Sequence, residues 1–457
     1  MSANQKLLFD FGRFKVPVRV PEYAEILAMG HAEPLPDPAQ AVLQALQEPI
    51  GCPPLAQLIG SRVAAKADAT AVVVISDDTR PVPYSGEDGI LFPLIDEMIR
   101  AGLAPANIRL LVATGTHHAM SEESLRAFLD PRIFSLGIPI HNHNCRNQDE
   151  LVNIGHTELG GDIFINRLYM ESDIKILTGL VESHFMAGVS GGRKSICPGL
   201  LAERSIHILH AGPILSSPLA TDLVLEGNPV HAEALAVALM AGCDMIINVT
   251  LDSAYRTTGV FGGDMEEAHI AAFNKLRTYA GIPVHQKYDL VITHGGFAGI
   301  NHYQAAKGGL VCVPVLEPGG VCILAGNHPD SDPIGGPKYK AMMRLLGEIG
   351  PYEYLEALLD PDWAFIPDQW EAQMWSRLFQ VTPPENLIYC TLDIAPDDFR
   401  WLPGTDARTL VLHAPNLEAL IQGSIDTAIQ RLSDNLGHCP SIAVLLDGPY
   451  GIPLPSR

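Results

Sequence analysis

Short apolar runs rich in valine, isoleucine and leucine recur along the chain, separated by longer amphipathic segments. This alternation is typical of α/β proteins, in which helices connect mostly parallel strands. The runs predict strands at Ala71–Ser76, Ile108–Ala113, Ile174–Thr178, Met245–Leu251, Leu290–Thr293, Val321–Ala325, Leu387–Cys390, Thr409–His413 and Ile442–Leu446. Helices are expected between them.

A boundary is predicted near residues 280–289, where a Gly-Ile-Pro turn precedes a new strand. We therefore expect an α/β fold with two domains, each a mostly parallel sheet flanked by helices. The first is a cofactor-binding domain over 1–283 and the second covers 284–413. The last segment, 414–457, could complete the first domain or belong to the second.

Polar side chains follow several predicted strands directly. Asp77 and Arg80 come after the strand at 71–76, His117 and His118 after the strand at 108–113, and His184 after the strand at 174–178. Ligands of open α/β sheets bind beyond the carboxyl ends of the strands. We therefore expect these loops to converge on one site, which we place in the cleft between the domains.

The charge balance argues against nucleic-acid binding. The 457 residues include 30 Lys plus Arg and 52 Asp plus Glu, a formal net charge of −22, and no basic run is present. Binding to a phosphate backbone depends mainly on Lys and Arg. An acidic chain without a basic patch is not expected to have a nucleic-acid partner.

Membrane insertion and export are not expected either. No window approaches the 18 or so apolar residues of a membrane span, and the N-terminus has no apolar signal core. The eight cysteines are scattered and form no CxxC pair. Isolated thiols fit a reducing compartment, so we expect a cytoplasmic protein.

The most concentrated motif is the glycine-rich segment 188–199, which contains Ser190, Gly191, Gly192, Arg193 and Lys194. Glycine backbone can approach an anion closely and the two cations can neutralise it. The segment does not match a P-loop, because Arg193 stands where the second glycine should precede the lysine. A nucleotide hydrolase is therefore disfavoured, and an ordinary glycine-rich turn is the simpler alternative.

Three further groups are candidates for chemistry. His207 and His210 are three residues apart and share a face if 201–211 is helical, as metal ligands can. Arg80 can bind a carboxylate through two hydrogen bonds, although its loop is also compatible with a simple capped turn. Tyr303 and Lys307 are four residues apart and share a face of a predicted helix.

Taken in order, these segments resemble the nickel-pincer nucleotide-dependent lactate racemase family. The shared motifs are D-x-T-R-P at 77–81, G-T-H at 115–117, H-x9-K from His184 to the lysine of a G-G-R-K-S loop, a further histidine sixteen residues after that lysine, Y-Q-x-x-K at 303–307 and Q-W at 369–370. The resemblance covers about residues 77–370, most of the chain.

The resemblance implies a cofactor and roles for individual residues. The cofactor is the nickel-pincer nucleotide, nickel pyridinium-3,5-bisthiocarboxylic acid mononucleotide, attached covalently at Lys194, with His210 as the protein ligand to nickel. His117 and His184 are the implied acid/base pair, and Arg80 and Lys307 hold the substrate. Tyr303, Gln304 and Trp370 line the substrate pocket. Asp77 also lines it and is counted among the cofactor-binding residues, together with Ser190, Gly191, Gly192 and Arg193.

Neighbouring residues leave three of these assignments with a rival. His118 follows His117 directly, but the G-T pair favours 117. His207 competes with His210, which has the matching spacing from Lys194. Trp375 competes with Trp370, which follows Gln369.

Two histidines suit the implied reaction, which inverts C2 of lactate or a related 2-hydroxy acid by hydride transfer through a 2-keto acid. Histidine can take up and return the hydroxyl proton near neutral pH. The expected partners are a small 2-hydroxy acid and the enzymes that mature the cofactor. The alternative function is a non-catalytic binder of the nickel nucleotide or of a carboxylate ligand on the same fold.

Overall fold

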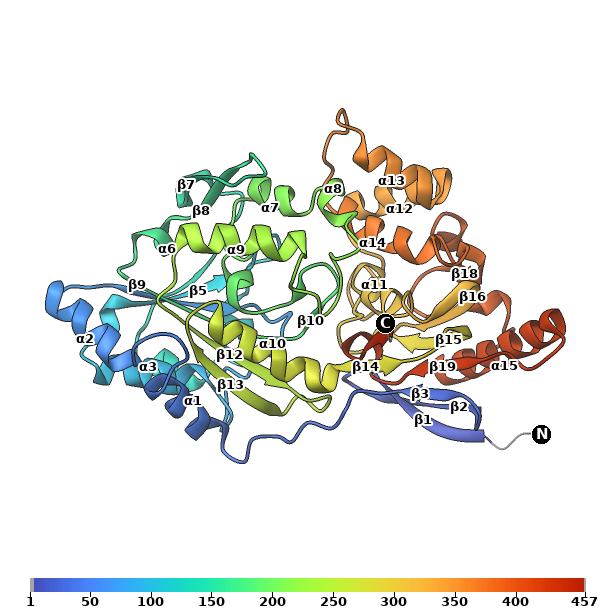
Figure 1. Cartoon of the computed structure of the whole chain (residues 1–457), viewed down its shortest axis with the longest axis horizontal. Coiled ribbons are helices and arrows are strands. Elements are labelled where there is room, and N and C mark those ends of the chain that lie inside the picture. The colour runs from blue at the N-terminus through green and yellow to red at the C-terminus, as the bar shows by residue number, and fades with distance from the viewer. Residues whose placement is uncertain (1–3, 456–457) are drawn as a thin grey trace. The chain divides into compact units, whose positions relative to one another are not determined.

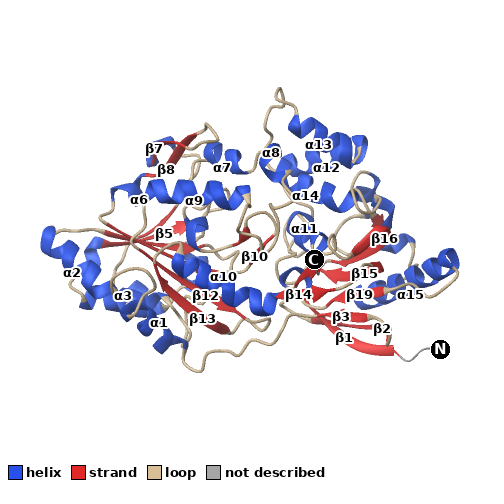
Figure 2. Cartoon of the chain, in the orientation of Figure 1, coloured by secondary structure: helices blue, strands red, loops and turns tan. Residues whose placement is uncertain are grey.

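The computed structural model describes residues 4–455, which divide into two compact units. We call residues 31–210 and 217–279 the N-terminal unit, and residues up to 30, 211–216 and from 280 onward the C-terminal unit. Both are α/β units in which helices flank a sheet (Figures 1 and 2). The predicted fold class is confirmed.

The N-terminal unit contains a six-stranded sheet in the order β13-β12-β9-β4-β5-β6. Its central strands are parallel, and the edge strand β13 is antiparallel to β12. The bounds are β4 (Ala71–Ser76), β5 (Ile108–Ala113), β6 (Ile140–Asn142), β9 (Ile174–Leu180), β12 (Met245–Leu251) and β13 (Thr257–Gly263). Two short antiparallel pairs are added, β7 (Leu151–His156) with β8 (Asp162–Asn166) and β10 (Ser183–His184) with β11 (Gly188–Val189).

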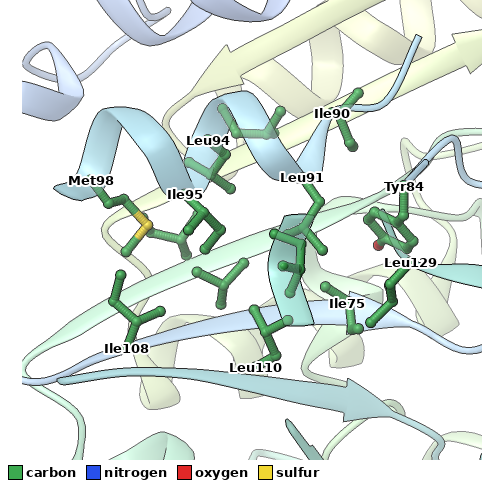
Figure 3. Packing of buried hydrophobic residues seen from close by; sticks show 14 of the residues in the cluster. Ile75, Tyr84, Ile90, Leu91, Leu94, Ile95, Met98, Ile108, Leu110 and Leu129 are labelled. Atoms are coloured by element: carbon green, nitrogen blue, oxygen red, sulfur yellow. The ribbon is translucent and has the colours of Figure 1, made fainter. Parts of the chain in front are cut away.

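Alternate residues of these strands are buried on opposite faces of the sheet. On one face, Ile75, Ile108 and Leu110 pack against Leu91 and Ile95 of helix α3 (Figure 3). On the other face, Val72 and Val74 of β4 and Leu111 of β5 are also buried. Burial on both faces explains the continuous apolar runs of the sequence. The helices are α1 (Pro38–Gln47), α2 (Leu55–Ala65), α3 (Leu91–Arg100), α4 (Glu122–Phe128), α5 (Pro131–Ser135), α6 (Arg167–Glu171), α7 (Glu203–Leu209), α9 (Pro229–Ala241) and α10 (Glu267–Ala280).

The C-terminal unit contains a second six-stranded sheet, in the order β18-β17-β16-β15-β19-β3, with all neighbours parallel. The strands are β3 (Glu25–Leu27), β15 (Tyr288–His294), β16 (Leu316–Ala325), β17 (Leu387–Cys390), β18 (Thr405–Asp406) and β19 (Ile442–Leu445). A hairpin of β1 (Asn4–Asp10) and β2 (Lys15–Pro21) and a parallel pair of β14 (Gly281–Val284) and β20 (Ile452–Pro455) complete its strands. Its helices are α8 (Gly212–Leu215), α11 (His302–Leu310), α12 (Pro337–Ile349), α13 (Pro351–Leu359), α14 (Gln369–Phe379) and α15 (Leu417–Leu436).

The units differ from the predicted first domain at residues up to 30, 211–216 and 280–283, which belong to the C-terminal unit. The predicted first domain, 1–283, includes β1 to β3, but β3 pairs with β19 in the C-terminal sheet. The segment 414–457 also belongs to the C-terminal unit, because β19 pairs with β15. A three-residue strand such as β3 has no detectable period, so its partner could not be inferred from sequence.

The strand prediction is wrong at Thr409–His413. A 3-10 helix covers Ala407–Thr409 and a turn follows, in which Leu412 is 75% exposed and His413 has a φ of 64°. Leu410 and Val411 of this run are only partly buried, and Val411 lies close to Gly423 of α15. All the other predicted strands are present. An apolar run therefore predicted a strand wrongly only at this segment, which is not fully buried.

Candidate active site

The loops that follow β4, β5 and β9 carry four of the predicted site residues. These strands are neighbours in the N-terminal sheet and run parallel, so their carboxyl ends lie at one edge. Asp77 and Arg80 follow β4, His117 follows β5, and His184 ends β10 just beyond β9. The predicted convergence of these loops within this unit is present.

Asp77 and His117 form a hydrogen-bonded pair between two of these loops. Asp77 is 4% exposed, and its Oδ2 lies 2.7 Å from Nδ1 of His117. Its Oδ1 accepts from the hydroxyl of Thr79 at 2.5 Å and from the Thr79 amide at 3.2 Å. Burial alone raises the pKa of Asp77, but the bonds from His117 and Thr79 and the charge of Arg80 outweigh it and lower the pKa. An ionised Asp77 accepts the Nδ1 proton of His117, so a neutral His117 has its lone pair on Nε2.

Arg80 connects the β4 loop to the segment after β9. Its Nε lies 3.1 Å from Oε1 of Glu182, and the two side chains are 24% and 22% exposed. The terminal guanidinium nitrogens can still meet a planar carboxylate. Arg80 is therefore held in place by a partner that the sequence did not reveal.

His184 is held in place through its Nδ1 atom, which accepts two backbone hydrogen bonds. The amides of Met186 and Ala187 both donate to Nδ1 of His184, each at 3.2 Å. An amide N–H can only donate, so Nδ1 carries no proton and a neutral His184 is protonated at Nε2. The two histidines thus have opposite tautomers.

The Lys194 loop, residues 188–199, packs tightly against the sheet. Gly191 has a φ of 73°, and a Cβ there would lie 2.7 Å from Cγ2 of Val181. The amide of Gly192 donates to Oδ1 of Asn248 at 2.8 Å, and the amide of Ser190 donates to the Glu182 carbonyl at 2.9 Å. These glycines therefore serve packing, and two of the amides expected to face an anion bond to the protein.

Arg193 points into the protein. It is 1% exposed, and its terminal nitrogens donate to the Ala187 carbonyl at 2.8 Å and contact Nε2 of His269 at 3.0 Å. Burial lowers the pKa of Arg193 to about 9. The contact with His269, a residue of α10, holds the Lys194 loop against that helix.

His210 directly follows α7 and has a defined tautomer. Its Nδ1 lies 2.9 Å from the Ile206 carbonyl, which can only accept, so the lone pair of the neutral ring is on Nε2. Burial, with smaller contributions from the charges of Lys194 and His207, lowers the pKa of His210 to about 4. A neutral imidazole presenting Nε2 beside Lys194 fits the implied nickel ligand and tether. His207, the rival ligand, lies within α7.

Backbone contacts join the Lys194 loop to the histidine loops. The amide of Gly199 donates to the Lys194 carbonyl at 3.2 Å, and the amide of Gly115 donates to the Gly199 carbonyl at 3.0 Å. Gly115 is two residues before His117. Asp77, Arg80, His117, His184, Lys194 and His210 therefore lie on one connected set of loops.

In the C-terminal unit, α11 presents the other predicted residues. Tyr303, Gln304 and Lys307 are partly exposed, whereas most of the helix is buried. The side chain of Asn301 caps the helix by accepting from the Gln304 amide at 2.9 Å. The predicted helix and shared face are confirmed.

The two candidate tryptophans have different surroundings. Nε1 of Trp370 donates to the hydroxyl of Tyr303 at 2.7 Å. Trp375 is fully buried, donates to Tyr339 at 2.8 Å and stacks on His302. Only Trp370 of the two contacts a predicted pocket residue through a hydrogen bond. Asp368, which directly precedes α14, has a φ of 70° and makes no side-chain capping bond.

Among residues 4–455, no helix has both the length and the apolar character that a membrane span requires. In the same range, no group of three or more His, Cys, Asp or Glu side chains is arranged to hold a metal ion.

Sequence reasoning missed several residues that hold the site. Glu182 pairs with Arg80, Asn248 binds the Lys194 loop, and His269 contacts Arg193. Glu182 stands two residues before His184, a proximity that was available as a signal. Asn248 and His269 lie on β12 and α10, and their role depends on the order of strands and helices in the unit.

Known proteins resemble this chain over most of its length. The family model for the lactate racemase N-terminal domain matches residues 9–222. A lactate racemase from Lactiplantibacillus plantarum is 30% identical over 412 residues, 90% of this chain and 89% of that protein. A lactate racemase from Thermoanaerobacterium thermosaccharolyticum is 32% identical over 358 residues, 76% of this chain and 80% of the relative.

Solved structures show the same similarity. The lactate racemase apoprotein from Thermoanaerobacterium thermosaccharolyticum matches with a TM-score of 0.82 and 26% identity, over 99% of this chain and 100% of that one. A Thermotoga maritima protein matches with a TM-score of 0.59 and 16% identity, over 88% and 97%, and shows the fold alone. Since a relative at 30% identity is covered over almost its full length, this chain belongs to the lactate racemase family, a family of isomerases.

Proposed function

We propose that this chain is a racemase that inverts C2 of lactate or a related 2-hydroxy acid through a 2-keto acid intermediate, using a nickel-pincer nucleotide attached at Lys194. The observation that carries the proposal is the Asp77–His117 pair beside Arg80, which joins a base to a carboxylate-binding cation. The reaction takes place in the cytoplasm, where scattered thiols stay reduced.

His117 takes the hydroxyl proton in this mechanism. Nε2 carries the lone pair, and the carboxylate of Asp77 stabilises the imidazolium that forms. When bound, the cofactor supplies the acceptor for the C2 hydride and returns it. Loss of the proton to His117 while hydride leaves gives a neutral carbonyl, which avoids a carbanion next to a carboxylate.

His184 is the second acid/base residue. In the tautomer that the amides of Met186 and Ala187 impose, its Nε2–H donates a hydrogen bond, which suits the carbonyl oxygen of the keto acid. To accept a proton at Nε2, the ring must first give up these two bonds. A small rotation of His184 is therefore part of turnover in the direction in which it acts as base.

Substrate binding needs local cations because the net charge of −22 repels an anion at long range. Arg80 binds the carboxylate and Lys307 the carboxylate and hydroxyl region. Tyr303, Gln304 and Trp370 shape the pocket; the bond from Trp370 to Tyr303 supports a common role for these two.

The cofactor is held by residues of the Lys194 loop and α7. Lys194 is the tether and His210 ligates nickel through Nε2, in agreement with its tautomer. Ser190, Gly191, Gly192 and Arg193 act mainly by fixing the loop, since two of its amides and the Arg193 guanidinium bond to the protein. Asp77 acts through His117. The maturation enzymes are the expected partners that deliver the cofactor.

The test begins with maturation of the chain by the pincer-synthesis enzymes. We expect a mass increase on the peptide carrying Lys194, nickel in the purified protein, and loss of optical purity from one or more of a panel of 2-hydroxy acids. Lys194→Arg is the matched control and should show no added mass. An unmodified Lys194 in the wild-type chain would exclude the cofactor.

The alternative function, a non-catalytic binder, is separated by the same preparation. A modified and nickel-loaded chain that racemises no acid of the panel would favour the binder. For the racemase, His117→Ala and His184→Ala should each abolish activity, and His118→Ala should retain it, since Asp77 bonds to His117 and not to His118. Substrate deuterated at C2 should react more slowly and retain part of its label in the product.

A further inference from the structure

The first turn of α14 buries a carboxyl group. Glu371 is 2% exposed, and its Oε1 has no hydrogen-bond partner within the described residues 4–455. Burying an unpaired carboxylate is strongly unfavourable, so such groups are retained where a neighbour or a function compensates. No motif of the sequence singled out Glu371.

Four charged or titratable groups lie close enough to this carboxyl to interact with it electrostatically. Lys307 and Tyr303 come from α11, Tyr339 comes from α12, and Asp368 directly precedes α14. From α13, the hydroxyl of Tyr354 donates to the backbone of Gln369, and α8 offers backbone carbonyls to Gln373 and Arg377. Lys307, on the helix α11 that packs against α14, is thus a cation that favours the ionised form of Glu371.

The charge state of this group changes in an accessible pH range. Burial raises the pKa of Glu371 to about 8, against the opposing charge of Lys307 and with a contribution from Asp368. Burial raises the pKa values of Tyr303 and Tyr339 well above the ordinary value, so these phenols stay neutral. Glu371 therefore loses its proton at a higher pH than an ordinary carboxyl group, while both phenols stay neutral.

We propose that Glu371 is a positioning residue whose protonation state sets how strongly Lys307 attracts the carboxylate of the substrate. As a neutral acid, Glu371 adds no negative charge beside the ammonium group. As a carboxylate, it becomes an internal counter-ion of Lys307 and competes with the ligand. This inference rests on the proposed function, because it assigns Lys307 to substrate binding.

Steady-state kinetics of the matured chain test the consequence for binding. Between pH 7 and 9.5, KM for lactate should rise by about fivefold or more, a coupling common between interacting sites, while kcat changes less. In Glu371→Gln, which is neutral at every pH, this rise in KM should disappear. Glu353→Gln, at an exposed site on α13, is the matched control and should keep it. An unchanged alkaline rise in Glu371→Gln would overturn the proposal.

Carbon-13 NMR of the chain labelled at the glutamate carboxyls gives a readout that needs neither cofactor nor turnover. One resonance, absent in Glu371→Gln, should titrate near pH 8, and in Lys307→Met it should titrate at higher pH because the ammonium no longer favours the carboxylate. A Glu371 resonance that titrates near pH 4.5, or that Lys307→Met does not move, contradicts the coupling. If Glu371→Gln does not fold, Lys307→Met still identifies the coupled resonance.

The two experiments separate the inference from the proposed function. The wild-type chain could show no racemase activity while its Glu371 resonance titrates near pH 8 and shifts in Lys307→Met. That result would reject the proposed function and leave the coupling between Glu371 and Lys307 intact. Lactate added to the same NMR samples at pH 7 and 9.5 then reports binding directly. Equal affinity at both pH values would reject the proposed effect on the ligand.

Discussion

The Oδ2 atom of Asp77 lies 2.7 Å from Nδ1 of His117, and the carboxylate is almost completely buried while the imidazole is about half exposed. The carboxylate therefore fixes both the tautomer and the orientation of a ring that can reach a ligand. It also stabilises the protonated ring after proton transfer. This pair makes the edge of the N-terminal sheet suited to acid/base chemistry.

Asp77→Asn should lower kcat by about a hundredfold or more, the typical contribution of a well-placed general base. The amide removes the charge that stabilises protonated His117 and can donate to Nδ1, which favours the wrong tautomer. Racemisation of lactate by the matured variant measures the effect. Asp78→Asn is the matched control, because Asp78 is exposed, and should retain activity. Equal activity of the two variants would rule out the role of Asp77.

Arg80→Lys should raise KM by about ten- to hundredfold and lower kcat less, since a lysine loses the two-pronged carboxylate contact and the bond to Glu182. Initial rates over a range of lactate concentrations separate the two parameters. Arg126→Lys, on an exposed face of α4, should leave both unchanged. A change confined to kcat would place Arg80 outside substrate binding.

Much of the site could be predicted because its residues follow apolar runs. Asp77, His117 and His184 stand beyond strands whose bounds the sequence located closely. Because parallel strands present their carboxyl ends at one edge of a sheet, the loops that follow these strands were expected to lie together. Local pattern and one topological rule were sufficient for these residues.

The supporting residues could not be predicted, because their partners are distant in sequence. Asn248 reaches Gly192 only because β12 lies beside β9, and Lys307 acts electrostatically on Glu371 only because α14 packs on α11. The three-residue strand β3 likewise joins a sheet formed from residues beyond 280. Each depends on tertiary packing that no local period encodes.

Gly191→Ala should lower the free energy of unfolding by about 3 kcal/mol, because alanine is disfavoured at a φ of 73° and its Cβ would meet Val181 at 2.7 Å. Gly137→Ala is the matched control: its φ is 66°, but no atom lies within 4 Å of the added Cβ. It should cost about 1 kcal/mol. Denaturant unfolding of both variants measures the difference, and the two costs should coincide only if the Lys194 loop is not tightly packed.

Stability should fall as the pH decreases from about 6.5 to 4, because buried histidines resist protonation. Burial lowers the pKa values of His143 and His294 to about 4, and each donates at Nε2 to a carbonyl while accepting at Nδ1 from an N–H. Above pH 6.5 both the folded and unfolded forms are neutral. Between 6.5 and 4 only the unfolded chain binds these protons, at about 1.4 kcal/mol per pH unit for each.

Urea unfolding at pH 5, 6, 7 and 8 measures this dependence. His294→Gln should be less stable at pH 7 yet lose less stability on acidification, since one titrating group is gone. His118→Gln, at an exposed position, should keep the slope of the wild-type chain. A wild-type stability that is constant between pH 6.5 and 5 would show that these histidines are protonated in the folded chain as readily as in the unfolded one.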